Sequence, residues 1–226
     1  MSVQTTTPPA QTQVAAPPAN TSPTAPPAGF MGLWRVSKSY DGATPVLADY
    51  TLPLAPGGVT VLMGTSGGGK TTMLRMLLGL ERPDTGTVAG LEGLRLSAVF
   101  QEDRLCENLS AMANVCLPHG RLHRPERAHL WTRVENALAQ VGLGGCADKP
   151  VHSLSGGMKR RVALLRAALA DFDLIAFDEP LKGLDEATKR TTMESLLPHL
   201  AGKTVVWVTH DRDDLGFFEN PQVVEL

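Results

Sequence analysis

The stretch Gly64-Thr65-Ser66-Gly67-Gly68-Gly69-Lys70-Thr71 decides the fold of this chain. It fits the pattern GxxxxGK[ST], follows a short apolar run at residues 59–63, and leads into apolar residues at helical spacing over residues 73–78. A strand, a glycine-rich loop and a helix in this order predict a phosphate-binding loop, because backbone N–H groups and the helix dipole both attract phosphate. Lys70 is expected to reach the β- and γ-phosphates of a nucleotide, and the Thr71 hydroxyl to ligate Mg²⁺. The alternative is a glycine-rich turn before an ordinary helix, and the strand before the loop argues against it.

The remaining apolar runs predict a sheet around this loop. Residues 97–100, 174–177 and 204–208 are short and rich in β-branched or aromatic residues, which is typical of strands buried on both faces of a parallel sheet. Two further strands, at 31–37 and 46–54, form an antiparallel portion near the N-terminus. Helices are predicted around 130–141, 158–170 and 186–197. The fold class is therefore α/β, a P-loop NTPase with a mostly parallel sheet and a helical insertion at about residues 102–160.

The first 28 residues have a different composition from the rest. They contain seven prolines, no charged side chain and few large apolar ones. Such a segment cannot bury enough surface to offset its ordering entropy, so we expect a disordered, proline-rich tail over residues 1–28 and a folded domain over residues 29–226. A proline-rich docking ligand is the alternative reading of the tail.

Composition excludes several classes of protein. The formal net charge of −2 over 226 residues gives no basic field for nucleic acid or for an anionic lipid surface. Three cysteines without paired spacing indicate free thiols rather than a disulfide framework or a zinc site. No apolar run reaches the length of a membrane span, and no leader sequence is recognisable, so the chain is expected to remain in the cytoplasm.

Polar side chains follow three of the predicted strands. Asp178 and Glu179 come directly after residues 174–177, Gln101 follows Phe100, and His210 follows the strand at 204–208. Ligands of open α/β sheets bind at the carboxyl ends of the strands, so these side chains are expected to meet at one site. Asp178 is placed to hold Mg²⁺ and Glu179 to orient the attacking water. The alternative is that the two carboxylates cap the segment that follows.

A second glycine-rich segment, Leu154-Ser155-Gly156-Gly157-Met158, precedes a helix that carries Lys159, Arg160 and Arg161 near its start. Ser155 is a good helix N-cap, and capping alone is one explanation for it. A serine and two glycines at a helix start also form an anion site. One nucleotide pocket does not account for two phosphate-binding loops.

The ordered set of motifs resembles the ATPase subunit of an ATP-binding cassette (ABC) transporter over residues 30–226. The resemblance rests on the GTSGGGKT loop, Gln101 after VF, LSGGM at 154–158, FDE at 177–179, GLD at 183–185 and THD at 209–211. In such proteins two domains pack head to tail, and each ATP lies between the phosphate loop of one and the LSGG segment of the other. The resemblance therefore implies a dimer, with a homodimer permitted, and ATP and Mg²⁺ as cofactors.

The resemblance also implies roles for individual residues. Gln101, Glu179 and His210 would be catalytic, and Asp185 would lie at the dimer seam. The residues implied to bind ATP are Tyr40, Gly64, Thr65, Ser66, Gly67, Gly68, Gly69, Lys70, Thr71 and Thr72, with Tyr40 stacking on adenine. The segment that would contact the partner's ATP comprises Leu154, Ser155, Gly156, Gly157 and Met158. The implied Mg²⁺ ligands are Thr71, Gln101 and Asp178.

The chain departs from the usual family pattern at a few positions. Thr71 replaces a serine, Met158 replaces a glutamine, and Lys182-Gly183 replace a serine and a small residue. The Met158 side chain is therefore not expected to make the polar contact of the usual glutamine, and the seam around residues 182–183 is expected to differ in detail.

The segments VFQEDRL and NLSAMANV resemble those of importer ATPases of the nitrate, sulfonate and taurine type. The resemblance implies a peripheral subunit on the cytoplasmic face of the membrane, working with permease subunits and a substrate-binding protein and not with nucleic acid. Residues 101 to about 114 would form much of the permease contact. An exporter or lipid-extraction ATPase, and a cassette ATPase acting on DNA or ribosomes, are the alternatives.

Overall fold

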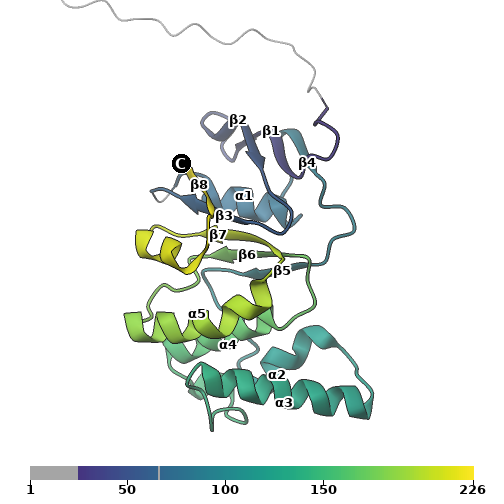
Figure 1. Cartoon of the computed structure of the whole chain (residues 1–226). Helices are drawn as coiled ribbons and strands as arrows, with labels where there is room; N and C mark the ends of the chain where they lie inside the picture. Colours follow the sequence, from purple (N-terminus) through teal and green to yellow (C-terminus); the bar gives the residue numbers. More distant parts are fainter. Residues whose placement is uncertain (1–24, 66) are drawn as a thin grey trace, which may run out of the picture.

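A computed structural model describes residues 25–65 and 67–226. Most of the predicted tail, residues 1–24, and Ser66 of the phosphate loop lie outside the described residues. The described chain forms two sheets and a layer of helices, stacked as shown in Figure 1. The expected α/β architecture, with a parallel sheet and a separate antiparallel one, is confirmed. In this part of the chain no helix is long and apolar enough to cross a membrane.

The larger sheet has five parallel strands in the order β5-β6-β7-β3-β8. Its strands are β3 (Val59–Met63), β5 (Leu96–Val99), β6 (Leu174–Asp178), β7 (Thr204–Val208) and β8 (Gln222–Glu225). Every residue of β6 and β7 is buried, as their continuous apolar runs predict, because helices or the second sheet cover both faces. The edge strands β5 and β8 are more exposed.

The smaller sheet is antiparallel, in the order β2-β1-β4. It consists of β1 (Gly32–Ser39), β2 (Pro45–Pro53) and β4 (Thr85–Ala89). Helix α1 (Lys70–Leu77) lies between the two sheets and buries Met73, Leu74 and Leu77 against both. This packing fixes the helix start, and therefore the end of the phosphate loop.

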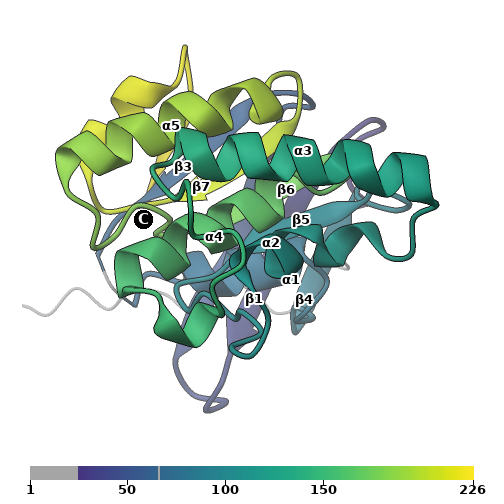
Figure 2. The same ribbon diagram turned by 90° about the horizontal axis from the view of Figure 1, so that it is seen from below.

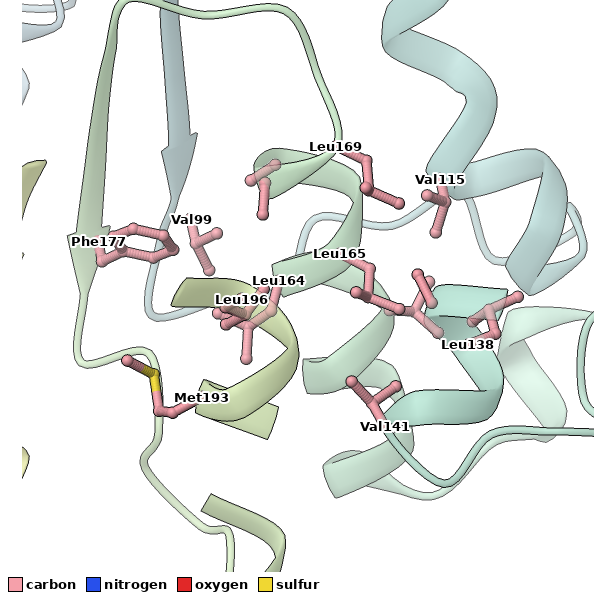
Figure 3. Close-up of a cluster of buried hydrophobic side chains, with 14 of the residues drawn as sticks. Val99, Val115, Leu138, Val141, Leu164, Leu165, Leu169, Phe177, Met193 and Leu196 are labelled. Carbon is pink, nitrogen blue, oxygen red and sulfur yellow. The ribbon is translucent and has the colours of Figure 1, made fainter. Parts of the chain in front are cut away.

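Helices cover the other face of the parallel sheet (Figure 2). Helices α4 (Gly156–Ala168) and α5 (Glu186–Leu200) lie next to the sheet, and α2 (Ala111–Cys116) and α3 (Arg124–Gln140) pack outside them. Three short 3₁₀ turns, at Leu117–His119, Val151–Ser153 and Arg212–Phe217, complete the structure. Figure 3 shows the shared core, in which Phe177 and Val99 from the sheet meet leucines of α4 and α5.

The sequence prediction missed three elements, β4, β8 and α2. The strands contain four or five residues at sheet edges, with glycine, threonine, glutamine or glutamate among them, so they lack a strong apolar run. Helix α2 has only six residues, too few for a clear helical period. Helix α5 continues past the predicted end at residue 197 to Leu200, with Pro198 inside the helix.

We predict unequal stability costs for alanine at two glycines with positive φ. A Cβ on Gly86 (φ 82°) would collide with the carbonyl oxygen of Arg35 on the neighbouring strand, whereas a Cβ on Gly79 (φ 67°) meets nothing within 4 Å. Gly79→Ala should cost about 1–2 kcal/mol, the usual cost of a left-handed backbone. Gly86→Ala should cost roughly 3 kcal/mol or more, because the strands must also separate. Urea unfolding of both variants measures the difference, and equal costs would contradict the described strand contact.

Candidate functional site

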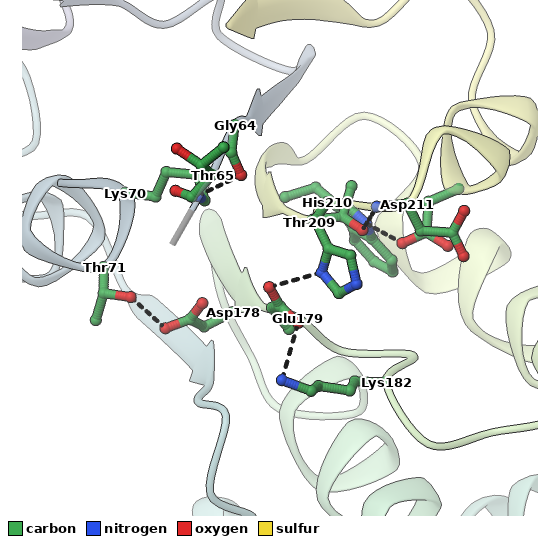
Figure 4. Close-up of polar contacts among 12 residues, drawn as sticks. Gly64, Thr65, Lys70, Thr71, Asp178, Glu179, Lys182, Thr209, His210 and Asp211 are labelled. Atoms are coloured by element: carbon green, nitrogen blue, oxygen red, sulfur yellow. Dashed lines mark hydrogen bonds and ion pairs between the residues drawn. The ribbon is translucent and has the colours of Figure 1, made fainter. Parts of the chain in front are cut away.

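The phosphate loop curls between the end of β3 and the start of α1. Gly67 and Gly69 have φ of 92° and 81°, a region that side chains other than glycine rarely adopt. A Cβ on Gly69 would also lie 2.8 Å from the Leu47 side chain. Lys70 is 7% exposed, and its Nζ donates to the carbonyl oxygens of Gly64 and Thr65, at 2.8 and 2.7 Å. In Figure 4 the Lys70 ammonium lies against the backbone oxygens of Gly64 and Thr65 at the start of the loop.

Thr71 and Asp178 face each other across the end of the sheet. The Thr71 hydroxyl donates to Asp178 Oδ2 at 3.0 Å. Burial raises the pKa of Asp178 above its ordinary 3.8, and the hydrogen bond from Thr71 lowers it by less. A buried carboxylate with one hydroxyl beside it suits a hard cation with oxygen ligands.

The donor set fits Mg²⁺ bound together with a nucleotide. Among the described residues no group of three or more His, Cys, Asp or Glu side chains is placed to hold a metal ion. Mg²⁺ is typically held by one or two carboxylates plus substrate phosphates and water, and does not need a cage built by the protein. Thr71 and Asp178 would supply the protein oxygens, beside the loop that attracts the phosphates.

Glu179 follows Asp178 in an uncommon backbone conformation, with φ of 48°. Its Oε1 lies 2.9 Å from His210 Nδ1, and its Oε2 lies 3.5 Å from Lys182 Nζ. Oε2 is buried, yet it accepts no hydrogen bond from any residue that the structure describes. A buried carboxylate oxygen without a hydrogen-bond donor is costly, so Oε2 retains an unused acceptor position beside the cavity.

Eight of the predicted residues line one cavity of about 410 Å³: Gly67, Gly69, Lys70, Thr71, Thr72, Gln101, Asp178 and Glu179. Gln101 on the loop after β5 forms part of its wall. The complete lining comprises Val46, Gly67, Gly69, Lys70, Thr71, Thr72, Gln101, Asp178, Glu179 and Lys182. The structure therefore brings together residues as far apart in the sequence as Val46 and Lys182. His210 does not line this cavity and reaches it only through Glu179.

Tyr40 directly follows β1 and lies beside the first turn of α1. Its side chain is 63% exposed, and its hydroxyl is 3.1 Å from the Thr72 hydroxyl on the first turn of α1. Lys38 Nζ lies 5.7 Å from the centre of the ring. An exposed aromatic ring that is hydrogen-bonded to α1, the helix after the phosphate loop, can stack on a flat, apolar ligand.

The glycine-rich segment 154–158 is not part of the cavity. Ser155 caps α4 by accepting a hydrogen bond from Met158 N at 3.3 Å, which is the local role proposed by the simpler interpretation. Leu154 is buried, whereas Ser155 and Gly156 are exposed. A capping serine partners one backbone N–H, and the first turn of a helix has further N–H groups without an intrahelical acceptor.

Asp185 also has a capping role. Its carboxylate accepts hydrogen bonds from the Thr188 backbone N at 3.0 Å and the Thr188 hydroxyl at 2.7 Å, which lowers its pKa. It begins α5 directly after the loop that contains Glu179 and Lys182. An additional contact across a dimer seam remains a prediction for this residue.

Two residues of the site were missed in the sequence. Lys182 was noted only as a departure, yet its ammonium lies beside Glu179 in the cavity wall. Arg160 was noted only as one of three basic residues, yet it is buried under the loops that contain Gln101 and Glu179. No pattern in the sequence distinguishes Arg160 from its partly exposed neighbours Lys159 and Arg161, because nothing local predicts which face of α4 meets those loops.

The fold and this cavity define a phosphate-loop nucleotide-binding protein. The comparison with protein families narrows this to one of them: residues 47–182 match the ABC transporter family. The chain belongs to that family, whose ATP-binding subunits are ATPases.

Curated relatives agree with this assignment. The chain is 40% identical to the aliphatic sulfonates import ATP-binding protein SsuB 1 of Xanthomonas axonopodis, over 81% of this chain and 76% of that one. It is 37% identical to the taurine import ATP-binding protein TauB of Pseudomonas entomophila, over 85% and 77%. It is 38% identical to the spermidine/putrescine import ATP-binding protein PotA of Marinobacter nauticus over 81% of this chain. That match spans only 52% of PotA.

Solved structures agree on the fold. The dimeric bacterial ABC transporter cassette MJ0796 superposes with a TM-score of 0.74 at 30% identity, over 86% of this chain and 94% of that one. The same cassette is also known in a dimeric post-hydrolysis state bound to ADP and Pi, with the same TM-score.

We predict that Asp178→Asn stabilises the protein without nucleotide at pH 7. The wild-type carboxylate is buried, and its raised pKa means that its ionised form costs folding free energy. The gain should be complete above the folded-state pKa and should vanish as the pH falls to about 4, the ordinary value. A rise of roughly 2–4 °C in the melting temperature corresponds to about 1 kcal/mol in a domain of this size.

The matched control is Asp148→Asn, which changes an exposed carboxylate and should leave the melting curve unchanged. The same Asp178→Asn variant should lose the increase in ATP affinity that Mg²⁺ produces. A destabilised variant at pH 7 that still responds to Mg²⁺ would contradict this account of Asp178.

Proposed function

We propose that this protein is the ATP-hydrolysing, energy-coupling subunit of an ABC importer, and that it binds Mg-ATP in the 410 Å³ cavity. The observation that carries the proposal is the meeting of Lys70, Thr71, Asp178 and Glu179 in one cavity. Nucleotide hydrolysis needs a cation for the phosphates, oxygen ligands for Mg²⁺ and a carboxylate that binds the attacking water. Lys70 is the cation, Thr71 and Asp178 are the oxygen ligands, and Glu179 is the carboxylate in this proposal.

In this proposal the protein groups act mainly by binding and orienting. The backbone N–H groups of the phosphate loop and Lys70 would hold the β- and γ-phosphates, and Thr71 and Asp178 would hold Mg²⁺, which would supply positive charge to the phosphates. Oε2 of Glu179 accepts a hydrogen bond from the attacking water, while His210 fixes the other oxygen from 2.9 Å. Gln101, which lines the same cavity, orients that water and responds to the metal.

The proposal includes a second copy of the chain. The segment 154–158 is exposed at its serine and first glycine, has helix N–H groups available, and is not part of the chain's own cavity. A head-to-tail dimer would place it on the γ-phosphate bound by the partner, with Asp185 at the seam. The dimeric structure of the related cassette MJ0796 supports the presence of a second copy.

The importer assignment, with a sulfonate or taurine type of substrate, is supported by the names of the relatives SsuB and TauB. It implies a peripheral position on the cytoplasmic face of the membrane, permease subunits, and a substrate-binding protein that delivers the substrate. The loop from Gln101 to about Asn114 is the proposed permease contact. Asn114 is fully buried and bonds the backbone N and O of Cys106, so it shapes this loop while residues 106–109 are exposed.

We predict that Glu179→Gln leaves ATP binding within about twofold and lowers steady-state turnover by roughly 10²–10⁴-fold, the usual contribution of a general base. The control is Glu219→Gln, which changes an exposed carboxylate far along the chain and should keep full turnover. Equilibrium binding of a fluorescent ATP analogue and phosphate release measure the two quantities. Full turnover in Glu179→Gln would overturn the role assigned to Glu179.

We predict that the natural complex, extracted in mild detergent, contains this chain together with a membrane permease. We expect a permease because residues 101–114 are the proposed contact surface for one. A transport assay on that complex, with a sulfonate supplied outside, should show ATP-dependent uptake. Recovery with DNA or ribosomes and no membrane protein would support a cassette ATPase of another class, and ATP-dependent efflux would support an exporter.

A further inference from the structure

Arg160 lies on the second turn of α4 and is only 5% exposed. Its guanidinium has five N–H donors in a fixed plane, and a buried cation is costly unless these donors find acceptors. The acceptors in this structure come from two loops outside α4, so the residue joins three separate parts of the chain.

The first loop follows β6 and contains the proposed catalytic glutamate. Arg160 Nε donates to the Pro180 carbonyl oxygen at 2.7 Å. Nη2 donates to the carbonyl oxygens of Asp178 at 3.0 Å and Glu179 at 2.7 Å. Three consecutive peptide groups are therefore fixed by one side chain, and the middle residue is the one with a φ of 48°.

The second loop follows β5 and contains Gln101. Arg160 Nη1 donates to the Phe100 carbonyl oxygen at 2.6 Å and to Asp103 Oδ1 at 3.1 Å, with the Gln101 carbonyl oxygen further away at 3.4 Å. These contacts complete the set: all five N–H donors have an acceptor, and Asp103 supplies the counter-charge. Arg166, further along α4, adds hydrogen bonds to the carbonyl oxygens of Asp103 and Arg104.

The third part is α4 itself, which begins at the segment 154–158. Arg160 is four residues after Gly156, a distance of about 6 Å along a rigid helix. A displacement of the helix start therefore moves the guanidinium, and with it the peptide groups beside Gln101 and Glu179. In the proposed dimer the helix start lies on the ATP of the partner, whereas Gln101 and Glu179 belong to the chain's own site.

We propose that Arg160 is a positioning residue that couples the two ATP sites of the dimer. Contact of the 154–158 segment with one ATP sets, through Arg160, the backbone positions of Gln101 and Glu179 at the other ATP. The two sites consequently hydrolyse ATP cooperatively. This inference rests on the proposed dimer but not on the identity of the transported substrate.

The chemistry of arginine is specific for this role. Lysine retains the charge but has three donors on one atom, so it cannot reach acceptors spread over both loops. Arg160→Lys should therefore separate the loops from α4 while keeping the cation beside Asp103. The matched variant is Arg133→Lys, which makes the same replacement on the exposed face of α3.

The experiment measures ATP hydrolysis against ATP concentration for the full-length wild type and both variants, with ATP affinity and melting temperature measured in parallel. The wild type should show a Hill coefficient above 1, and Arg133→Lys should match it. Arg160→Lys should bind ATP within about twofold of wild type, lose about 10-fold in kcat, and hydrolyse with a Hill coefficient of 1.

Unchanged cooperativity in a folded Arg160→Lys variant would overturn the proposal, as would a wild-type dimer with a Hill coefficient of 1. A parallel loss of affinity, kcat and melting temperature at unchanged Hill coefficient would assign Arg160 a purely structural role. Sedimentation of Glu179→Gln with ATP separates this inference from the proposed function. A dimer there, combined with unchanged cooperativity in Arg160→Lys, rejects only the coupling, whereas a monomer rejects the dimer on which it depends.

Discussion

Parallel strands all end at the same edge of a sheet, and this constraint organises the whole site. Strand β3 ends in the phosphate loop, β6 in Asp178 and Glu179, and β5 in Gln101. The registers of β3, β7 and β6 align these ends, with Leu62 beside Val208 and Val208 beside Asp178. The hydrogen bond between Thr71 and Asp178 is the direct result, because it joins the loop after one strand to the end of another. Without that alignment the same residues would be unrelated surface groups.

Much of this could be predicted from the sequence because its signals are local. A glycine pattern between a strand and a helix, and carboxylates directly after a buried apolar run, specify which residues lie at the edge of the sheet. The edge strands β4 and β8 and the short helix α2 were not predicted, because their position depends on pairing and packing with distant segments. The same reason explains Arg160, whose acceptors lie about 20 and 60 residues away. The contact of Tyr40 with Thr72 is equally non-local.

Three features of Asp178 and Glu179 in the site lower the stability of the fold. Asp178 is buried with a raised pKa, Glu179 has a strained φ, and Glu179 Oε2 accepts no hydrogen bond among the described residues. Each feature costs folding free energy, and a bound cation would offset the charge of the two carboxylates. Lys182 partly compensates by placing a cation 3.5 Å from that oxygen. Because Lys182 departs from the usual family pattern, this pairing of an ammonium with Glu179 Oε2 is specific to this chain.

In the proposed dimer the phosphate loop forms half of a site that a second chain completes. The most direct measurement is a crystal structure of Glu179→Gln with ATP and Mg²⁺. The account predicts two ATP molecules between two chains, each with its γ-phosphate against Lys70 of one chain and the segment 154–158 of the other. Mg²⁺ should lie about 2.0–2.1 Å from the Thr71 hydroxyl oxygen. ATP held by a single chain, with residues 154–158 facing solvent, would contradict the claim.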